Sequence, residues 1–464
     1  MVGAFLRLGH GLQVRILQSE IVEVGSPTLV DQMISGSANY VGPMPARKLV
    51  AILAIVVLGA GLFLAGRVSV SNAPVSTATS STSSEVKNSF NPISVDFSSL
   101  MRGWALGTTS CRVSTVCLSL SKSTNAGRSW SVSPLPQSLL RLADRRVLGS
   151  SAILYGTTNG YDIQSLNVHF ANADDGWIYG SLPVPTKVNG QQSAMFKPVF
   201  WSTHDGGLVW KLQPQSWFYS QGPVLDLEAT SSAVYLMAFN KSLNVTVESS
   251  PVGQDSWHVS DSKGLLTPAG GGLLSGAIVL SGSHGWLVEG NDRGTTGSAQ
   301  LNNSGRWVPW TPPCQSVGDS LAVPAASTSS HIIVECVMGG FASPLSSAAP
   351  RGAALGSTWL YTSDNAGRTF TAGPELGRGN VYFGSVLASP KPTTILITRN
   401  ISPHQELLAS FDGGRHWTVV YFGHVSFVHF VSSTEGVALV QPSKGLNKLI
   451  MTFDGGYNWF PIPF

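Results

Sequence analysis

The sequence has little charge. Only 11% of its 464 residues are Asp, Glu, Lys or Arg, and 28 basic residues against 25 acidic ones leave a formal net charge of +3. Soluble domains usually carry about 25% charged residues. A nucleic-acid-binding protein needs a dense field of Lys and Arg, which so sparse and balanced a charge does not supply. We therefore expect no nucleic-acid partner.

Cysteine is also scarce. The four residues Cys111, Cys117, Cys314 and Cys336 are too few for a small disulfide-stapled fold, and no two have the Cys-x-x-Cys spacing of zinc sites. Their even number and pairwise clustering predict two disulfides, Cys111 with Cys117 and Cys314 with Cys336, in an oxidising compartment. Four buried free thiols are the alternative.

Uninterrupted stretches long enough for helices are rare, because 50 Gly and 27 Pro punctuate the chain. The chain is nevertheless 43% hydrophobic, with 13 Trp and 19 Phe, so it can bury a large core and is not disordered. Many short strands joined by turns are the expected structure.

One long apolar run stands near the start. Residues 49–66 read LVAILAIVVLGAGLFLAG, which is 18 residues without a charge. As a helix this run spans roughly 27 Å of hydrocarbon, enough for one membrane crossing. Arg47 and Lys48 precede it, so the positive-inside rule places the N-terminus in the cytoplasm and the rest of the chain outside.

A cleaved signal peptide is the alternative, since reading from Met44 gives a basic start, an apolar stretch and the small residues Ser71, Asn72 and Ala73. Both readings export the remainder, so we expect a single-pass cell-membrane protein or a secreted one. The expected domains are 1–46, a short cytoplasmic tail or mis-assigned start; 47–67, the transmembrane helix or signal core; 68–91, a Ser/Thr-rich flexible tether; and 92–464, a repeat domain.

The repeat is an eight-residue box, Ser/Thr-x-Asp/Asn-x-Gly-x-x-Trp/Phe, present in five complete copies. The defining residues are Ser123, Asn125, Gly127 and Trp130; Thr203, Asp205, Gly207 and Trp210; Ser363, Asn365, Gly367 and Phe370; Ser410, Asp412, Gly414 and Trp417; and Thr452, Asp454, Gly456 and Trp459. Asp or Asn can bond to backbone N–H groups further along the turn, and Gly accepts a positive φ. The aromatic residue then opens the next strand and buries a large ring.

Two degenerate copies fill the middle of the chain, ending at Trp257 and Trp307. With them the terminal aromatics fall at 130, 210, 257, 307, 370, 417 and 459, so that most spacings are 42 to 50 residues and two are longer. That period is typical of four-stranded propeller blades. A second repeat, a strand followed by Gly-Trp and another strand, lies upstream of several boxes, at Trp104, Trp177 and Trp286. We predict an all-β, seven-bladed β-propeller.

These motifs give the chain a family likeness. It resembles the Asp-box (bacterial neuraminidase repeat) superfamily of β-propellers, and its alternation of Gly-Trp strands with Asp-Gly-Gly-x-x-Trp boxes is similar to the photosystem II assembly/stability factor family. The resemblance covers everything after the tether. It implies the propeller fold but says little of function, because sialidases, other glycosidases, sorting receptors and assembly factors share the box.

Enzymatic readings find little support. The sialidase family uses an Arg-Ile-Pro motif and three arginines that clamp a carboxylate, but the only Arg-Ile here, Arg15 with Ile16, precedes the apolar run. Four carboxylates stand in boxes, where a turn role is expected: Asp205, Asp364, Asp412 and Asp454. Four others have no partner that spacing reveals: Glu289, Asp292, Glu335 and Glu375. No box supplies the further acids of a calcium loop, and we expect no metal or cofactor.

Binding is the better hypothesis, and two insertions suggest where. Residues 134–164 contain Arg141, Arg145 and Arg146 opposite a row of apolar residues on a predicted short helix. This basic cluster could dock a partner, or the helix could merely cover the join between blades one and two. Residues 339–357 form a second, small-residue loop.

We therefore expect a non-catalytic protein-binding or assembly scaffold on the outer side of the cytoplasmic membrane, with a protein or glycan partner. An extracellular carbohydrate-active hydrolase of sialidase-like type is the alternative. The low charge also suits an acidic exterior, so we expect little loss of fold stability at low pH.

Overall fold

A computed structural model describes most of the chain after residue 89. It describes residues 5–8, 12–15 and 90–464, except 110–116, 143–165, 189–190, 214–223, 243, 261–274, 292–293, 315–319, 339–357, 377–380, 402–403 and 443–444. Two compact units are present, Met1–Ser84 and Glu85–Phe464. In the first, β1 (Phe5–Leu8) and β2 (Leu12–Arg15) form an antiparallel hairpin.

The predicted segment 47–67 lies outside the described residues, as does the tether up to residue 89. In the part of the chain that is described, no helix is long and apolar enough to cross a membrane.

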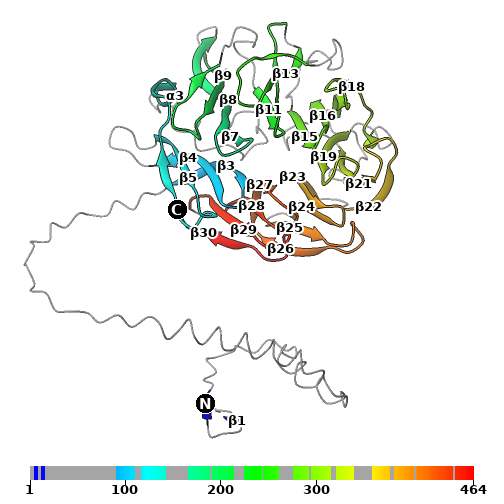
Figure 1. Cartoon of the computed structure of the whole chain (residues 1–464). Helices are drawn as coiled ribbons and strands as arrows, with labels where there is room; N and C mark the ends of the chain where they lie inside the picture. The colour runs from blue at the N-terminus through cyan, green and yellow to red at the C-terminus, as the bar shows by residue number, and fades with distance from the viewer. Residues whose placement is uncertain are drawn as a thin grey trace, which may run out of the picture. The chain divides into compact units, whose positions relative to one another are not determined.

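The second unit is a seven-bladed β-propeller, which confirms the prediction (Figure 1). Each blade is one antiparallel sheet of four strands in chain order. The blades are β3 (Asn91–Ser99), β4 (Arg102–Thr109), β5 (Cys117–Ser123) and β6 (Ser131–Ser133); β7 (Leu166–Phe170), β8 (Asp175–Val188), β9 (Gln191–His204) and β10 (Lys211–Leu212); β11 (Val224–Ala229), β12 (Ala233–Phe239), β13 (Val245–Pro251) and β14 (His258–Val259); β15 (Ser275–Ser281), β16 (His284–Asn291), β17 (Gly294–Leu301) and β18 (Trp307–Pro309); β19 (Ser320–Ala326), β20 (Ile332–Met338), β21 (Thr358–Ser363) and β22 (Thr371–Glu375); β23 (Val381–Lys391), β24 (Thr394–Ile401), β25 (His404–Ser410) and β26 (Thr418–Phe422); and β27 (His424–Phe430), β28 (Gly436–Gln441), β29 (Lys448–Thr452) and β30 (Phe460–Ile462).

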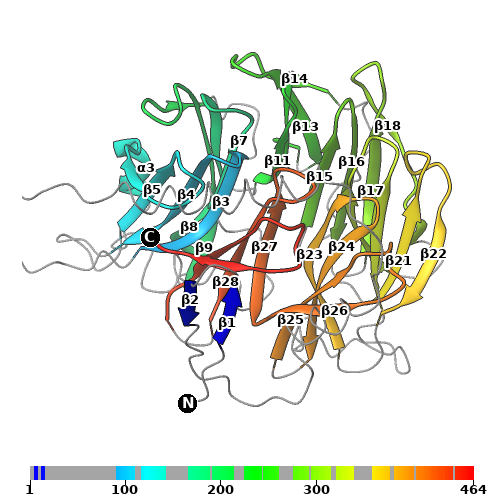
Figure 2. The same cartoon turned by 60° about the horizontal axis from the view of Figure 1, so that its bottom comes forward.

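The first strand of each blade lies nearest the axis. Figures 1 and 2 show β3, β7, β11, β15, β19, β23 and β27 gathered around the centre, with later strands further out. The turns between first and second strands and the box turns between third and fourth strands lie at the same end of the propeller. We call this end the turn face.

The box turns are held by one repeated hydrogen-bond pattern. In the last blade the Gly456 amide donates to Thr452 Oγ1 at 2.9 Å, and that hydroxyl donates to Asp454 Oδ1 at 2.9 Å. Asp454 Oδ1 also accepts the Asn458 amide at 3.0 Å. The other four complete copies repeat the bond from the Gly amide to the Ser or Thr hydroxyl, at 2.8 to 3.0 Å.

A second repeated bond ties each complete box to the neighbouring turn of its own blade. In blade 2 the Gly206 amide donates to Asp174 O at 2.8 Å, and in blade 7 the Gly455 amide donates to Thr434 O at 2.7 Å. Blades 1, 5 and 6 make the same contact between the same two turns. The box therefore orders the whole turn face rather than one hairpin alone.

The hydrophobic core is divided into seven clusters, and each of them joins two neighbouring blades. Between blades 1 and 2 the rings of Trp104 and Phe170 stack with centroids 3.6 Å apart. The ring closes in the same way, because Val95 and Phe97 of blade 1 pack with Val437 and Leu439 of blade 7. Among the described strands, none is exchanged between the first and last blades.

Side chains of one blade also satisfy the inner edge of the next. The innermost strand of a blade leaves amide groups without a sheet partner, which is costly when they are buried. Asp96 Oδ2 accepts the Phe170 amide at 2.6 Å, and Asp226 Oδ2 accepts the Ile278 amide at 2.7 Å. A similar bond joins the last blade to the first, since the backbone amide of Asn447 in blade 7 donates to Asn91 Oδ1 in blade 1 at 2.7 Å.

The disulfide between Cys314 and Cys336 is confirmed, and it ties the segment after β18 to β20. Cys117 is also disulfide-bonded, while Cys111 lies outside the described residues.

The turn pattern yields a prediction. Replacing Thr452 with Val removes only its hydroxyl, which is fully buried and bonds to Gly456 and Asp454. We expect the free energy of unfolding in urea to fall by about 1–3 kcal/mol, the usual cost of leaving a buried donor unsatisfied. Thr418→Val on exposed β26 is the control and should change it by less than about 0.5 kcal/mol. Equal effects of the two substitutions would show that the box hydroxyl does not hold the turn.

Candidate functional site

The structure distributes the residues that the sequence singled out over several places. The box residues lie in the turns described above. Arg141 is exposed on α3 (Gln137–Leu142), whose Leu139 is buried in the core between blades 1 and 2. Arg145, Arg146 and the whole insertion 339–357 lie outside the described residues.

Two of the four unassigned carboxylates, Glu289 and Glu335, are buried in different blades. Glu289 is completely buried on β16 on the side facing blade 3, and Glu335 is completely buried on β20 on the side facing blade 6. Neither carboxyl group has a hydrogen-bond partner among the described residues. Glu375 lies in β22, and Asp292 is not described. Glu289 and Glu335 therefore do not form a pair across a cleft.

A different set of polar side chains does come together, near the propeller axis. Asp96, His169 and His429 occupy the same level of β3, β7 and β27, since each is paired with the position in its second strand held by Trp104, Trp177 or Val437. We call the following residues the axial cluster: Asp96, His169, Tyr179, Asp226, Glu228 and His429.

Glu228 lies at the matching level of β11. It stands two residues before Thr230, whose amide closes the first turn of blade 3 by donating to Ala233 O. Ala171 closes the turn of blade 2 in the same way, two residues after His169. Four consecutive blades, 7, 1, 2 and 3, thus each place one ionisable residue at one level near the turn face.

Two contacts lie within the axial cluster. His169 Nδ1 lies 3.5 Å from Asp96 Oδ2, and Tyr179 donates its hydroxyl to Asp226 Oδ1 at 3.4 Å. His169 Nε2 has no hydrogen-bond partner within the described residues. His169, Asp226, Glu228 and His429 are only partly exposed as residues, and the Nε2 atom of His169 is buried.

Burial shifts the pKa values in the axial cluster so that the uncharged forms of the side chains are favoured. It raises the pKa of Asp226 to about 6, against the opposing effect of the Ile278 and Leu227 amides. Burial, followed by the charges of Asp226 and Asp96, raises the pKa of Glu228 well above its usual range. Burial also lowers the pKa of His169, against the nearby charge of Asp96. Three carboxyl groups therefore share a desolvated place in which positive charge is in short supply.

Among the described residues, no Lys or Arg is one of the charges that shift the pKa values of His169, Tyr179, Asp226 and Glu228. Burial and the neighbouring carboxylates raise the pKa of Tyr179 well above 10, which keeps its hydroxyl protonated and makes it a poor nucleophile.

Sequence reasoning missed the axial cluster, although a signal was present. The triplets Val95-Asp96-Phe97, Val168-His169-Phe170 and Val428-His429-Phe430 each put an ionisable residue between two apolar ones, at one offset before the second strand. An ionisable side chain recurring inside a buried strand indicates a shared polar site. Asp226 and Glu228 show the same alternation in β11, Val-Leu-Asp-Leu-Glu-Ala, whereas Tyr179 carries no such mark.

Comparisons with known proteins place the chain among propellers of several kinds. No family model matches the chain, and no curated protein matches it. Similar solved structures include YCF48 bound to D1 peptide (15% identity, TM-score 0.46, covering 79% of this chain and 94% of that one). They also include the PL25 ulvan lyase bound to its saccharide (9%, TM-score 0.47, 81% and 95%) and the BP39L lectin from Burkholderia pseudomallei (9%, TM-score 0.46, 81% and 99%).

The buried glutamates predict how stability depends on pH. Burial raises the pKa of Glu289 from 4.5 to about 7, and that of Glu335 well above 4.5. The folded state therefore binds more protons than the unfolded state between these values, and the free energy of unfolding falls as pH rises through this window. Glu289 alone accounts for about 2 kcal/mol between pH 5 and pH 8.

Urea unfolding of Glu289→Gln at both pH values measures this contribution, because Gln mimics the protonated side chain. We expect the variant to lose most of that pH dependence and to exceed the original protein in stability at pH 8. Glu435→Gln, in an exposed turn where Glu435 bonds to Ser432, is the control and should leave the slope unchanged. A pH slope as steep in Glu289→Gln as in the original protein would contradict the assignment.

Proposed function

We propose that this chain is a non-catalytic binding scaffold whose axial cluster takes a positively charged group of a protein partner. The observation that carries the proposal is the convergence of Asp96, Asp226 and Glu228 near the axis at the turn face. A Lys or Arg side chain of the partner would supply the cation that the cluster lacks.

The energetics favour such a ligand. Carboxyl groups with raised pKa values are unstable as anions until a cation arrives, so an ammonium or guanidinium group gains strong charge-assisted hydrogen bonds there. Binding would release protons from Asp226 and Glu228. Affinity is therefore expected to rise with pH between about 5.5 and 7.5.

The scaffold is proposed to work outside the cytoplasmic membrane, anchored by residues 47–67 or released after signal cleavage. The apolar run with its basic flank supports export, and so do the disulfides, which persist in oxidising compartments. The repeated bonds of the five complete boxes support membership of the Asp-box superfamily.

A carbohydrate-active hydrolase remains the second candidate. One observation favours it: Tyr179, Asp226 and Glu228 stand close enough to couple electrostatically, which is a constellation of a phenol with two carboxyl groups. The raised pKa of Tyr179 speaks against its use as a nucleophile.

Binding of defined peptides tests the proposal. A fluorescent Gly-Lys-Gly-Lys-Gly peptide and its Gln-containing counterpart are titrated with the propeller by fluorescence anisotropy, beside a glycan array. We expect the lysine peptide to bind about tenfold more tightly, a difference of 1.4 kcal/mol, and to bind more tightly at pH 7.5 than at pH 5.5.

The variant Asp226→Asn/Glu228→Gln removes both carboxylates while keeping an acceptor for the Ile278 amide, and it should abolish the preference for lysine. Asp364→Asn removes a carboxylate whose side chain is 89% exposed on the same face and should have no effect. Equal binding of both peptides, or glycan binding that the double variant removes, would overturn the proposal in favour of the alternative.

A further inference from the structure

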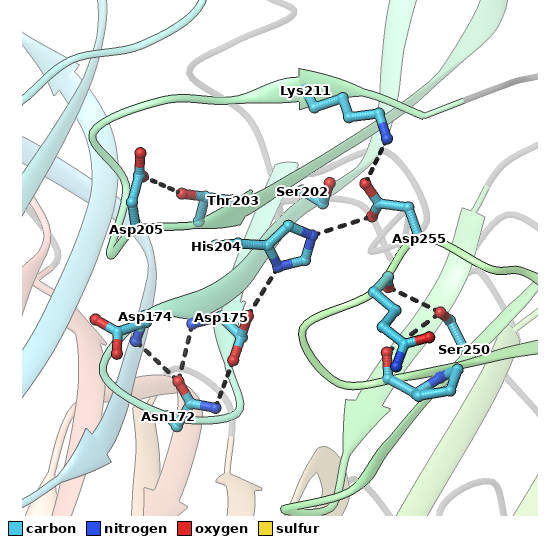
Figure 3. Close-up of polar contacts among 12 residues, drawn as sticks. Asn172, Asp174, Asp175, Ser202, Thr203, His204, Asp205, Lys211, Ser250 and Asp255 are labelled. Atoms are coloured by element: carbon cyan, nitrogen blue, oxygen red, sulfur yellow. Dashed lines mark hydrogen bonds and ion pairs between the residues drawn. The ribbon is translucent and has the colours of Figure 1, made fainter.

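The box turns of neighbouring blades meet through side chains of different character. At two junctions the second residue of one box lies beside the sixth residue of the next. Between blades 2 and 3 these residues are polar: His204 Nε2 lies 3.4 Å from Asp255 Oδ1, and Lys211 Nζ lies 2.9 Å from Asp255 Oδ2 (Figure 3). Between blades 6 and 7 they are aromatic, since the rings of Phe411 and Tyr457 stack with centroids 3.4 Å apart. The turn face is therefore polar at one junction and apolar at the other.

Exposed aromatic side chains are concentrated on blade 7. Among the described residues only five Phe, Tyr or Trp residues are strongly exposed, and all lie in the last two blades. Four belong to the box and outer strand of blade 7 or directly follow it, with exposed fractions of 41% to 51%, and we call them the aromatic rim: Phe453, Tyr457, Phe460 and Phe464. The rings of Phe453 and Phe460 lie 6.4 Å apart. Apolar surface gathered in one place marks an interaction site, whereas single exposed residues do not.

The outer strand of blade 7 is poorly suited to pairing with a peptide strand. Residues 459–464 read WFPIPF, without a charge or a hydroxyl group. Pro461 lies in β30 opposite Ile450 of β29, and a proline in a paired strand turns its nitrogen away from the partner strand. Pro463 also lacks an amide hydrogen. The outer edge therefore offers few amide donors, which weakens strand addition and lowers the cost of contact with an apolar medium.

The aromatic rim lies where the chain enters the propeller. Phe464 packs against Phe90, with ring centroids 4.6 Å apart, and against Trp130, with centroids 4.8 Å apart. The 22 residues 68–89, rich in Ser and Thr, join Phe90 to the predicted membrane segment 47–67. A flexible chain of that length has a root-mean-square span of about 25 Å. An anchored propeller therefore keeps its aromatic rim near the bilayer.

We infer that the aromatic rim docks blade 7 on the outer leaflet of the membrane that anchors the chain. Aromatic rings favour the boundary between headgroups and acyl chains, where the ring is buried and a polar atom such as the Tyr457 hydroxyl stays hydrated. The tether raises the effective concentration of the rim at the bilayer, so a contact too weak for a free protein suffices. The inference rests on the anchorage proposed above and not on the ligand of the axial cluster.

Photolabelling from lipid tests the docking. The full chain is reconstituted, one copy per disc, in nanodiscs of phosphatidylcholine and phosphatidylglycerol with a trace of diazirine phosphatidylcholine, and labelled residues are located by mass spectrometry. We expect residues 449–464 to carry about fivefold more label than the box of blade 2, in which Leu208 and Val209 are 65% and 68% exposed. Equal labelling of the two segments would overturn the inference.

Variants separate docking by the rim from chance contact with lipid. Phe453→Ser/Phe460→Ser removes two exposed rings and leaves the stacked pair of Phe411 and Tyr457 in place. Label at Ile462 and Phe464, which this variant retains, should fall to the level of the blade 2 box. The matched control Leu208→Ser/Val209→Ser should leave that label unchanged. Should the double variant fail to fold, Phe460→Ser alone gives the same test. Label that persists in the rim variant would contradict docking through these rings.

Two further measurements identify other outcomes. Loss of label at residues 449–464 when each disc holds two chains would assign the aromatic rim to a second copy and overturn the inference. Extraction of the full chain from membranes by alkaline carbonate would overturn the anchorage and the docking together. Binding of the lysine peptide should persist in Phe453→Ser/Phe460→Ser, so a failure of the axial ligand and a failure of the docking are distinguishable.

Discussion

The hydrogen bond from the Phe170 amide to the Asp96 carboxylate is the contact on which the fold and the site both depend. A propeller blade presents the inner edge of its first strand to the axis, where buried amides need acceptors. Asp96 satisfies one of them at 2.6 Å and so attaches blade 2 to blade 1. The same carboxylate lies 3.5 Å from His169 and therefore also belongs to the axial cluster. Blade assembly thus brings a charge to the axis.

Ionisable groups are rare in this chain, and the places of these few groups in the fold determine how its stability depends on pH. Box carboxylates such as Asp412 and Asp454 accept backbone amides, and these hydrogen bonds lower their pKa values, so they support the fold until strongly acid pH. Buried groups such as Glu289 and Glu335 act in the opposite sense and favour the folded state in moderate acid. The sequence predicted little loss of fold stability at low pH. The pKa shifts of the buried glutamates sharpen this prediction, because they raise the free energy of unfolding from pH 8 toward pH 5.

The sequence was sufficient for the architecture because its repeat reports a local turn. Gly456 and Thr452 define a hairpin within eight residues, and the spacing of such hairpins predicts the number of blades. The axial cluster was not accessible in this way, since His169 and His429 meet only after the ring has closed and the register of each blade is set. The polar contacts between blades 2 and 3 were hidden for a similar reason: the degenerate box of blade 3 shows which box residues are missing, but not that Asp255 lies near His204.

The central claim is that the axial cluster gives up protons to receive a cation. Calorimetric titration of the lysine peptide at pH 6.5, in buffers of different ionisation enthalpy, measures the protons exchanged on binding. Net release that disappears in Asp226→Asn/Glu228→Gln is the predicted result, because the pKa values of these carboxyl groups are raised in the free protein. Binding without proton release, or release that the double variant retains, would contradict the account.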